Sequence, residues 1–166
     1  MEIERKFTIK KLPENLEQYE CKVIEQGYLS TKPVVRIRKS NHDYILTLKS
    51  KKGIASTNQD VVISNEIEMP LDESSYEHLK KKVDDHFISK KRYIIPMKNG
   101  LKIELDVFEG RLKGLVFAEV EFPSEEEAKQ FEMPDWFLKD VSKDRRYGNG
   151  FLSKLNSFEE FETAQL

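Results

Sequence analysis

Charged and aliphatic residues alternate in short stretches of this chain, and the first stretch begins at the N-terminus. In residues 1–7 (MEIERKF), Glu2, Glu4 and Lys6 occupy every second position, and Ile3 lies between the two glutamates. Successive side chains of an extended strand point to opposite faces, so the stretch predicts a strand with one charged face. A single strand of this kind is typical of a solvated sheet, and the pattern becomes informative only if it recurs.

The pattern does recur along the chain. Further strands are predicted at residues 26–30, 34–40, 44–50, 65–70, 90–96, 101–108 and 117–123. Alternation puts Arg36 and Arg38 on one face of their strand, and it does the same for Glu119 and Glu121. Many short alternating strands predict a mostly antiparallel sheet with hairpin connections.

Helical patterns lie between and after these strands. They cover residues 71–87, 124–131 and the C-terminal tail at 153–166, and the second starts with a capping box formed by Ser124 and Glu127. No linker, fixed repeat or low-complexity block divides the 166 residues. We therefore expect a single domain over residues 1–166 with a C-terminal helix.

Charge and cysteine content exclude several classes of protein. The 28 basic and 30 acidic residues nearly cancel, so the bulk charge does not favour a nucleic-acid partner. No apolar run reaches the length of a membrane span, and the chain is charged from its second residue, so we expect neither a membrane segment nor a signal peptide. The single Cys21 excludes an internal disulfide, which fits a cytoplasmic location. The oligomeric state is not indicated.

Two architectures are compatible with such strands, and they differ in which face is inside. One is an open sheet with its aliphatic face on helices and its charged face in water. The other is a closed barrel with the charges in its lumen and the aliphatic residues packed outward against helices. Burying so many charges requires partners for them. A barrel would therefore bind a polyanion together with cations, because lysine and arginine suit the anion and clustered carboxylates suit a divalent metal.

The order of motifs shows a family resemblance. EIERK at 2–6 has the form ExExK, and RIRK, LTLKS, NEIEMP, KKRYII, IELDVFEGRLKGLVFAEVEFPSEEEA and DVSKDRRYGN follow. With these motifs the chain resembles the CYTH domain of the triphosphate tunnel metalloenzymes over about residues 1–152. The resemblance implies an α+β fold whose centre is an eight-stranded antiparallel closed β-barrel, the triphosphate tunnel, with helices packed outside. It therefore favours the barrel over the open sheet.

The resemblance also implies roles for individual residues. The positions that match metal-binding carboxylates, for Mg²⁺ or Mn²⁺, are Glu2, Glu4, Asp106, Glu119 and Glu121. The positions that match phosphate-binding cations are Lys6, Arg36, Arg38, Lys49, Arg92 and Arg145. Within these two sets, the residues expected to act directly in catalysis are Glu2, Glu4, Lys6, Lys49 and Arg145. One metal is expected near Glu2, Glu4 and Glu121, and a second near Asp106 and Glu119.

Some positions depart from the family pattern or stay ambiguous. The final motif offers Lys143, Arg145 and Arg146, and the sequence does not decide which of them faces the tunnel. No lysine or arginine occurs between Lys52 and Lys80, so one phosphate contact is expected to be lost or supplied by Lys51 or Lys52. The neutral stretch at 53–64 could form a rim that recognises an organic group.

The expected activity is metal-dependent hydrolysis of a small-molecule triphosphate. A chain of this size with no added domain favours inorganic tripolyphosphate, cleaved to pyrophosphate and phosphate. The alternatives are hydrolysis of thiamine or nucleoside triphosphates, cyclisation of ATP by an adenylate cyclase, and a non-catalytic polyphosphate-binding module. Such a module predicts that the carboxylates are missing, whereas both charged sets are present here, so an enzyme is favoured.

Overall fold

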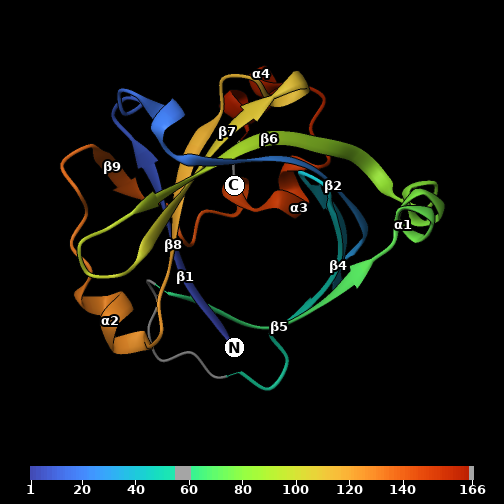
Figure 1. Ribbon diagram of the computed structural model, residues 1–166, viewed down its shortest axis with the longest axis horizontal. Helices are drawn as coiled ribbons and strands as arrows, with labels where there is room; N and C mark the ends of the chain where they lie inside the picture. The colour runs from blue at the N-terminus through green and yellow to red at the C-terminus, as the bar shows by residue number, and fades with distance from the viewer. Residues whose placement is uncertain (55–60, 165–166) are drawn as a thin grey trace.

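The computed structural model describes residues 1–54 and 61–164, and a closed antiparallel β-barrel is its centre (Figure 1). The strands are β1 (Glu2–Ile9), β2 (Glu20–Thr31), β3 (Val34–Ser40), β4 (Asp43–Ser50), β5 (Val62–Leu71), β6 (Asp84–Pro96), β7 (Lys102–Glu109), β8 (Val116–Glu121) and β9 (Phe137–Asp140). Their order is β5-β4-β3-β2-β6-β7-β8-β1-β9, and pairing of β5 with β1 closes the ring. The predicted eight-stranded barrel is therefore confirmed, with β9 added beside β1.

Strand register brings the alternating charges together inside the ring. Glu4 lies opposite Glu121, and Lys6 lies opposite Glu119, where β1 pairs with β8. On the next pair of strands, Glu104 of β7 lies opposite Glu119 of β8. Because partners in register share a face, these charged side chains point into one lumen.

Short helices lie between and after the strands. They are α1 (Glu73–Lys80), α2 (Glu125–Gln130), α3 (Asn149–Leu152) and α4 (Phe158–Thr163), with single 3₁₀ turns at Leu16–Gln18, Gly110–Leu112 and Arg145–Tyr147. The predicted helix at 71–87 is wrong beyond residue 80, because β6 already begins at Asp84 and pairs with β2. In the tail at 153–166, the described helix is limited to α4.

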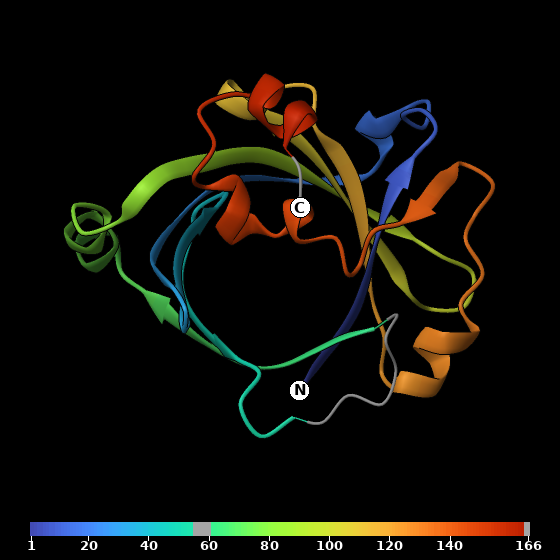
Figure 2. The ribbon, with the colours of Figure 1, turned by 180° about the vertical axis from the view of Figure 1, so that it is seen from behind.

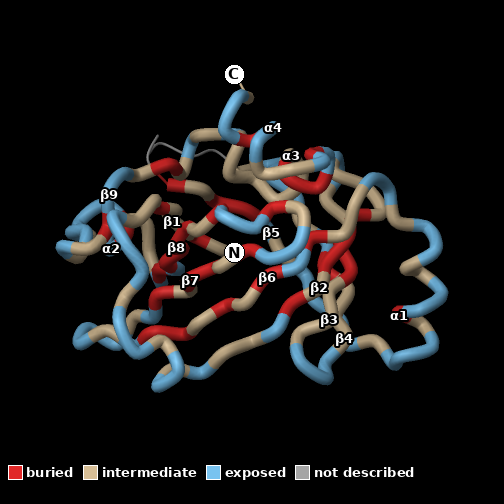
Figure 3. Tube along the Cα trace, turned by 90° about the horizontal axis from the view of Figure 1, so that it is seen from above, coloured by how far each residue is buried: buried red, intermediate tan, exposed pale blue. Residues whose placement is uncertain are grey.

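The outward face of one half of the barrel is the main hydrophobic core. Phe7, Leu105 and Val120 are fully buried there, and α2 covers them with Ala128. Figure 3 shows the buried segments of β1, β7 and β8 side by side beneath exposed loops. Burial of this face stabilises the barrel without using the lumen.

A second apolar cluster fills one end of the lumen. Phe108 and Phe117 point inward from β7 and β8 and pack with Leu152 of α3 and Phe161 of α4. Figures 1 and 2 show α3 within the outline of the ring of strands. The C-terminal segment therefore narrows the barrel at this end, and the charged part of the lumen lies beyond it.

Part of the outer surface does not match the expectation that helices cover the aliphatic residues. Leu48, Ile67 and Met69 on β4 and β5 are 43%, 63% and 55% exposed, so that expectation is wrong for this part of the wall. None of the described helices has the length and apolar character needed to cross a membrane.

Candidate active site

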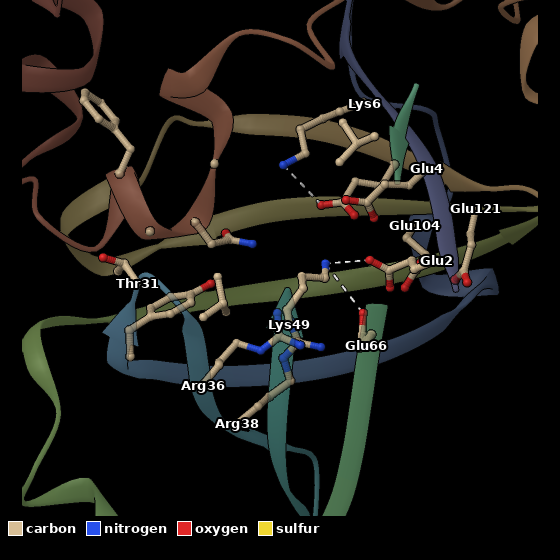
Figure 4. Close-up of a pocket in the computed structure, with 18 of the residues that line it drawn as sticks. Glu2, Glu4, Lys6, Thr31, Arg36, Arg38, Lys49, Glu66, Glu104 and Glu121 are labelled. Atoms are coloured by element: carbon tan, nitrogen blue, oxygen red, sulfur yellow. Dashed lines mark ion pairs between the residues drawn. The ribbon is translucent and has the colours of Figure 1, made fainter. Parts of the chain in front are cut away.

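A polar cavity of 1420 Å³ occupies the lumen of the barrel. Ten of the eleven site residues predicted from the sequence line it: Glu2, Glu4, Lys6, Arg36, Arg38, Lys49, Arg92, Glu119, Glu121 and Arg145. Figure 4 shows several of these side chains pointing toward one another from opposite walls. Asp106 is the predicted residue that does not line the cavity.

The carboxylates gather where β1 meets β8. Burial and the nearby charge of Glu119 raise the pKa of Glu4 to about 8. Burial and the charges of Glu2 and Glu104 likewise raise the pKa of Glu121. These carboxylates lie close enough to disfavour one another's ionised forms, and a bound cation would relieve that cost.

Lys49 of β4 is the cation nearest to this acidic group. Its Nζ lies 2.5 Å from Glu2 Oε1 and 3.5 Å from Glu66 Oε2, as the dashed lines in Figure 4 mark. Burial by itself would lower the pKa of Lys49, but Glu4 and Glu2 raise it well above its ordinary value. Lys49 is therefore held in its charged form at the boundary between the acidic and basic parts of the cavity.

Lys6 of β1 lies next to the apolar end of the lumen, with its Nζ 4.7 Å from the centre of the Phe117 ring. Its Nζ donates to the Tyr147 carbonyl oxygen at 2.7 Å and lies 3.6 Å from Glu119 Oε1. Burial would raise the pKa of Glu119, but Lys6 and Arg92 hold it well below its ordinary range. Glu119 thus stays ionised between two cations. Glu4, on the paired strand β1, is instead largely protonated at neutral pH, because its pKa is about 8.

The guanidinium groups of Arg36 and Arg38, both on β3, form the basic wall of the cavity. Arg36 is 7% exposed and donates through Nη2 to Thr47 Oγ1 at 3.2 Å. Its Nε is buried and has no hydrogen-bond partner among the described residues. A buried donor without a partner is costly, so this atom indicates that an acceptor belongs in the cavity.

Asp106 lies deeper in the lumen, near its apolar end, in a buried ion-pair network. Its Oδ1 accepts from Arg92 Nε at 2.7 Å, and its Oδ2 accepts from Arg92 Nη2 at 2.9 Å and Lys90 Nζ at 2.7 Å. Asp106 and Lys90 are both fully buried. Both carboxylate oxygens are occupied, so the geometry favours a counter-ion for Arg92 over the metal ligand predicted from the sequence.

Glu104, two residues before Asp106 on β7, is one of several cavity-lining carboxylates outside the predicted site. It lines the cavity and accepts from Arg92 Nη1 at 2.9 Å. Alternation puts both residues on one face, but Asp106 lies opposite Phe117, near the apolar end, whereas Glu104 lies opposite Glu119. Alternation alone carries no signal for this difference in depth.

The C-terminal segment contributes further cations. Lys143 and Arg145 line the cavity, and Lys143 Nζ donates to the Val61 carbonyl oxygen at 3.0 Å. Arg146 is not among the lining residues and pairs with Asp144 at 2.7 Å instead. Lys154 also lines the cavity, although no motif in the sequence marks it.

The stretch at 51–64, where a cation expected from the family pattern is missing, is only partly described. Lys51 lines the cavity, as expected for a residue that replaces a missing cation. Half of the expected rim at 53–64, residues 55–60, lies outside the described residues.

The carboxylates do not form a finished metal site by themselves. Across residues 1–54 and 61–164, no three acidic, histidine or cysteine side chains converge closely enough to hold an ion alone. Hard divalent cations accept phosphate and water oxygens as ligands, so Glu2, Glu4, Glu104 and Glu121 suit a metal that arrives with an anionic ligand.

Comparison with known proteins identifies close relatives. A family model for the CYTH domain matches residues 1–148. An inorganic triphosphatase of Nitrosomonas europaea is 35% identical over 155 residues, which cover 92% of this chain and 96% of that protein. An inorganic triphosphatase of Acetivibrio thermocellus is 32% identical over 169 residues, with 97% of each chain covered.

Solved structures share the architecture. The crystal structure of the inorganic triphosphatase NE1496 has a TM-score of 0.68 and 33% identity, and it covers 95% of this chain and 97% of its own. A putative adenylyl cyclase from Hippeastrum, described as having a dominant triphosphatase activity, has a TM-score of 0.56 at 18% identity, covering 78% of this chain and 83% of its own. At that identity, the likeness concerns the fold alone.

Proposed function

Because the chain belongs to the CYTH domain family, we propose that it is a metal-dependent triphosphatase that cleaves inorganic tripolyphosphate to pyrophosphate and phosphate. The relatives from Nitrosomonas and Acetivibrio that carry the name inorganic triphosphatase match it over nearly its whole length, which supports this substrate. The reaction adds one water molecule across a phosphoanhydride bond.

The observation that carries the proposal is the buried Nε of Arg36, which has no partner among the described residues. It lies in a cavity that Lys6, Arg38 and Lys49 also line. An anion with several oxygen atoms would satisfy Arg36 and balance its neighbours at once. A phosphate chain meets this requirement, because guanidinium groups bind phosphate oxygens in a bidentate manner.

We assign phosphate binding to the six cations predicted from the sequence. They are Lys6, Arg36, Arg38, Lys49, Arg92 and Arg145, and all of them line the cavity. Cations arranged around the phosphate chain stabilise the charge that spreads over the equatorial oxygens as the bond breaks. Because Asp106 and Glu104 fix Arg92 on two sides, this guanidinium needs little reorganisation when substrate binds.

We assign the metal to Glu2, Glu4 and Glu121, together with Glu104. The raised pKa values of Glu4 and Glu121 fit a group of carboxylates that gains from a cation. A bound Mg²⁺ or Mn²⁺ would neutralise phosphate charge and lower the pKa of a bound water molecule. We assign to Glu119, whose pKa Lys6 and Arg92 lower, the role of accepting a hydrogen bond from the attacking water.

Competition kinetics test the substrate assignment. Tripolyphosphate, ATP and thiamine triphosphate are supplied together with Mg²⁺ and with Mn²⁺, and each product is followed. Tripolyphosphate should have the highest kcat/KM, because the phosphate chain makes the contacts that stabilise the transition state. A preference of about tenfold or more for an organic triphosphate would overturn the assignment, and binding without turnover of any substrate would favour a polyphosphate-binding module.

A further inference from the structure

We infer that Gln26 is a positioning residue that orients Arg38 toward the phosphate chain while leaving the charge of Arg38 uncompensated. The inference rests on the proposed function, because it concerns the same cavity. Gln26 itself is fully buried and is not among the residues that line this cavity.

Strand register places the two side chains together. Gln26 of β2 lies directly opposite Arg38 of β3, and its Oε1 accepts from Arg38 Nε at 2.8 Å. The amide nitrogen, Nε2, donates to the Tyr28 hydroxyl oxygen at 3.4 Å. Arginine can only donate, so the amide oxygen must face Arg38 and the amide nitrogen must face Tyr28.

This contact occupies one edge of the guanidinium and leaves the other edge for a ligand. The amide of Gln26 is the single hydrogen-bond acceptor of Arg38 in the part of the chain that the structure describes. The Nη1 and Nη2 groups of Arg38 therefore keep their donors for the cavity, which Arg38 lines. Two parallel donors suit two oxygens of a phosphate group.

The neutral anchor of Arg38 contrasts with the charged anchors of Arg92. Arg92 pairs with Asp106 and Glu104, so carboxylates balance its charge. Among the described residues, no carboxylate oxygen lies within 4.0 Å of a nitrogen atom of Arg38. A glutamine fixes the side chain as a glutamate would, but it adds no negative charge beside the anionic substrate.

The lowered pKa of Arg38 agrees with the interpretation that its charge has no partner in the free protein. Burial, followed by the charges of Arg36 and Arg92, lowers the pKa of Arg38 to about 9. The charged form is therefore expensive in the free protein, and a polyanion is the partner that offsets this cost. Arg38 is thus a cation whose charge the substrate balances.

The orientation of the amide also affects Tyr28, which lines the cavity. Since Gln26 donates to the hydroxyl oxygen, the hydroxyl proton of Tyr28 is free to point elsewhere. Gln26 therefore leaves donors on both Arg38 and Tyr28 for the same ligand.

The substitution Gln26→Glu tests the requirement for a neutral anchor. The shape and the acceptor are kept, but the new carboxylate would balance Arg38, so the Kd for tripolyphosphate should rise about tenfold or more in calorimetry of the full chain without added metal. The melting temperature of the free protein should stay equal or rise. A lower melting temperature with an unchanged Kd would indicate a structural role and overturn the inference.

Glu25→Gln is the matched control on the same strand. Glu25 pairs with Lys80 and Tyr76 rather than with any residue of the basic wall, so its substitution should leave the Kd unchanged. An equal rise in Kd for this variant would show that any change of β2 weakens binding, which would overturn the inference.

A double-mutant cycle provides a second test that does not depend on the glutamate variant. Gln26→Met should raise the Kd in the wild-type background and have no further effect in an Arg38→Ala background, because Gln26 acts through Arg38. Equal effects in both backgrounds would overturn the inference. If the wild-type protein binds tripolyphosphate but does not cleave it, the proposed function fails while the Kd comparison still tests Gln26.

Discussion

Replacing Asp106 by asparagine distinguishes a buried counter-ion from a metal ligand. Asp106 is fully buried, and its two oxygens accept three hydrogen bonds from Arg92 and Lys90. Asparagine offers one oxygen, so at least one of these donors would face the donor group of the amide. The change also removes the charge that balances two cations, and breaking a buried pair in this way costs about 3–5 kcal/mol of unfolding free energy.

The protonation state of Lys90 limits how much unfolding free energy the Asp106→Asn variant loses. Burial already lowers the pKa of Lys90 to about 7, even though Asp106 favours its charged form. Without Asp106, Lys90 can lose its proton near neutral pH, which removes one of the two charges that Asp106 balances. The remaining cost is that of Arg92, which stays protonated in the variant and keeps Glu104 as a partner.

The assay is urea unfolding of the metal-free protein, followed by far-UV circular dichroism. Glu25→Gln is the control, because Glu25 and Lys80 are each 37% exposed and such a pair contributes about 0–1 kcal/mol. A loss below about 1 kcal/mol for Asp106→Asn would refute the counter-ion assignment. A gain in stability would indicate that Asp106 repels the other carboxylates, as expected for an empty metal site.

Three further predictions concern the cavity itself. Glu4→Gln should abolish Mg²⁺-dependent turnover and leave the metal-free melting temperature equal or higher, because burial and Glu119 disfavour the ionised form; near-normal turnover would contradict the metal assignment. The pKa of Glu4 is about 8 in the folded state and 4.5 otherwise, so its stabilising effect is present below pH 4.5 and is lost as pH rises through 8. Melts of wild type and Glu4→Gln should therefore diverge increasingly between pH 5 and 8.5, and a constant difference would refute the raised pKa. Arg38→Ala should remove the rise in melting temperature caused by tripolyphosphate, and equal stabilisation of both proteins would contradict the assignment.

The strands of the barrel were predictable because they alternate between charged and aliphatic residues. In residues 2–6, two glutamates and a lysine lie on one face, and the structure directs that face to the lumen. The pattern itself left an open sheet possible, and the family resemblance was needed to favour the barrel. Local capping was also readable, since Ser124 caps α2 by accepting from the Glu127 amide as the pattern predicts.

The depth of each side chain along the lumen was not predictable from alternation. Glu104 and Asp106 share a face, yet one lines the cavity and the other is enclosed by Lys90 and Arg92. This difference depends on Phe117 and Phe108 in neighbouring strands and on the C-terminal segment that packs on them. Such contacts are set by the closure of the barrel, which a single strand does not encode.

The C-terminal boundaries were unpredictable for a similar reason. The spacing of Leu155, Phe158 and Phe161 suggested one helix over 153–166, but α3 precedes this range and α4 begins at Phe158. These residues pack on the end of the barrel rather than along one helix face. Tertiary contacts with the lumen therefore override the local periodicity.

Phosphorus NMR of tripolyphosphate with the full chain and Mg²⁺ is the most direct test of the proposed activity. We predict equal amounts of pyrophosphate and phosphate, with pyrophosphate persisting, because a chain of two phosphates cannot reach both the carboxylates and all the cations of the cavity. The Glu4→Gln variant should show no such cleavage, and its matched control, Glu14→Gln at an exposed glutamate away from the cavity, should behave as wild type. Absence of Mg²⁺-dependent cleavage, or consumption of pyrophosphate as fast as tripolyphosphate, would contradict the proposal.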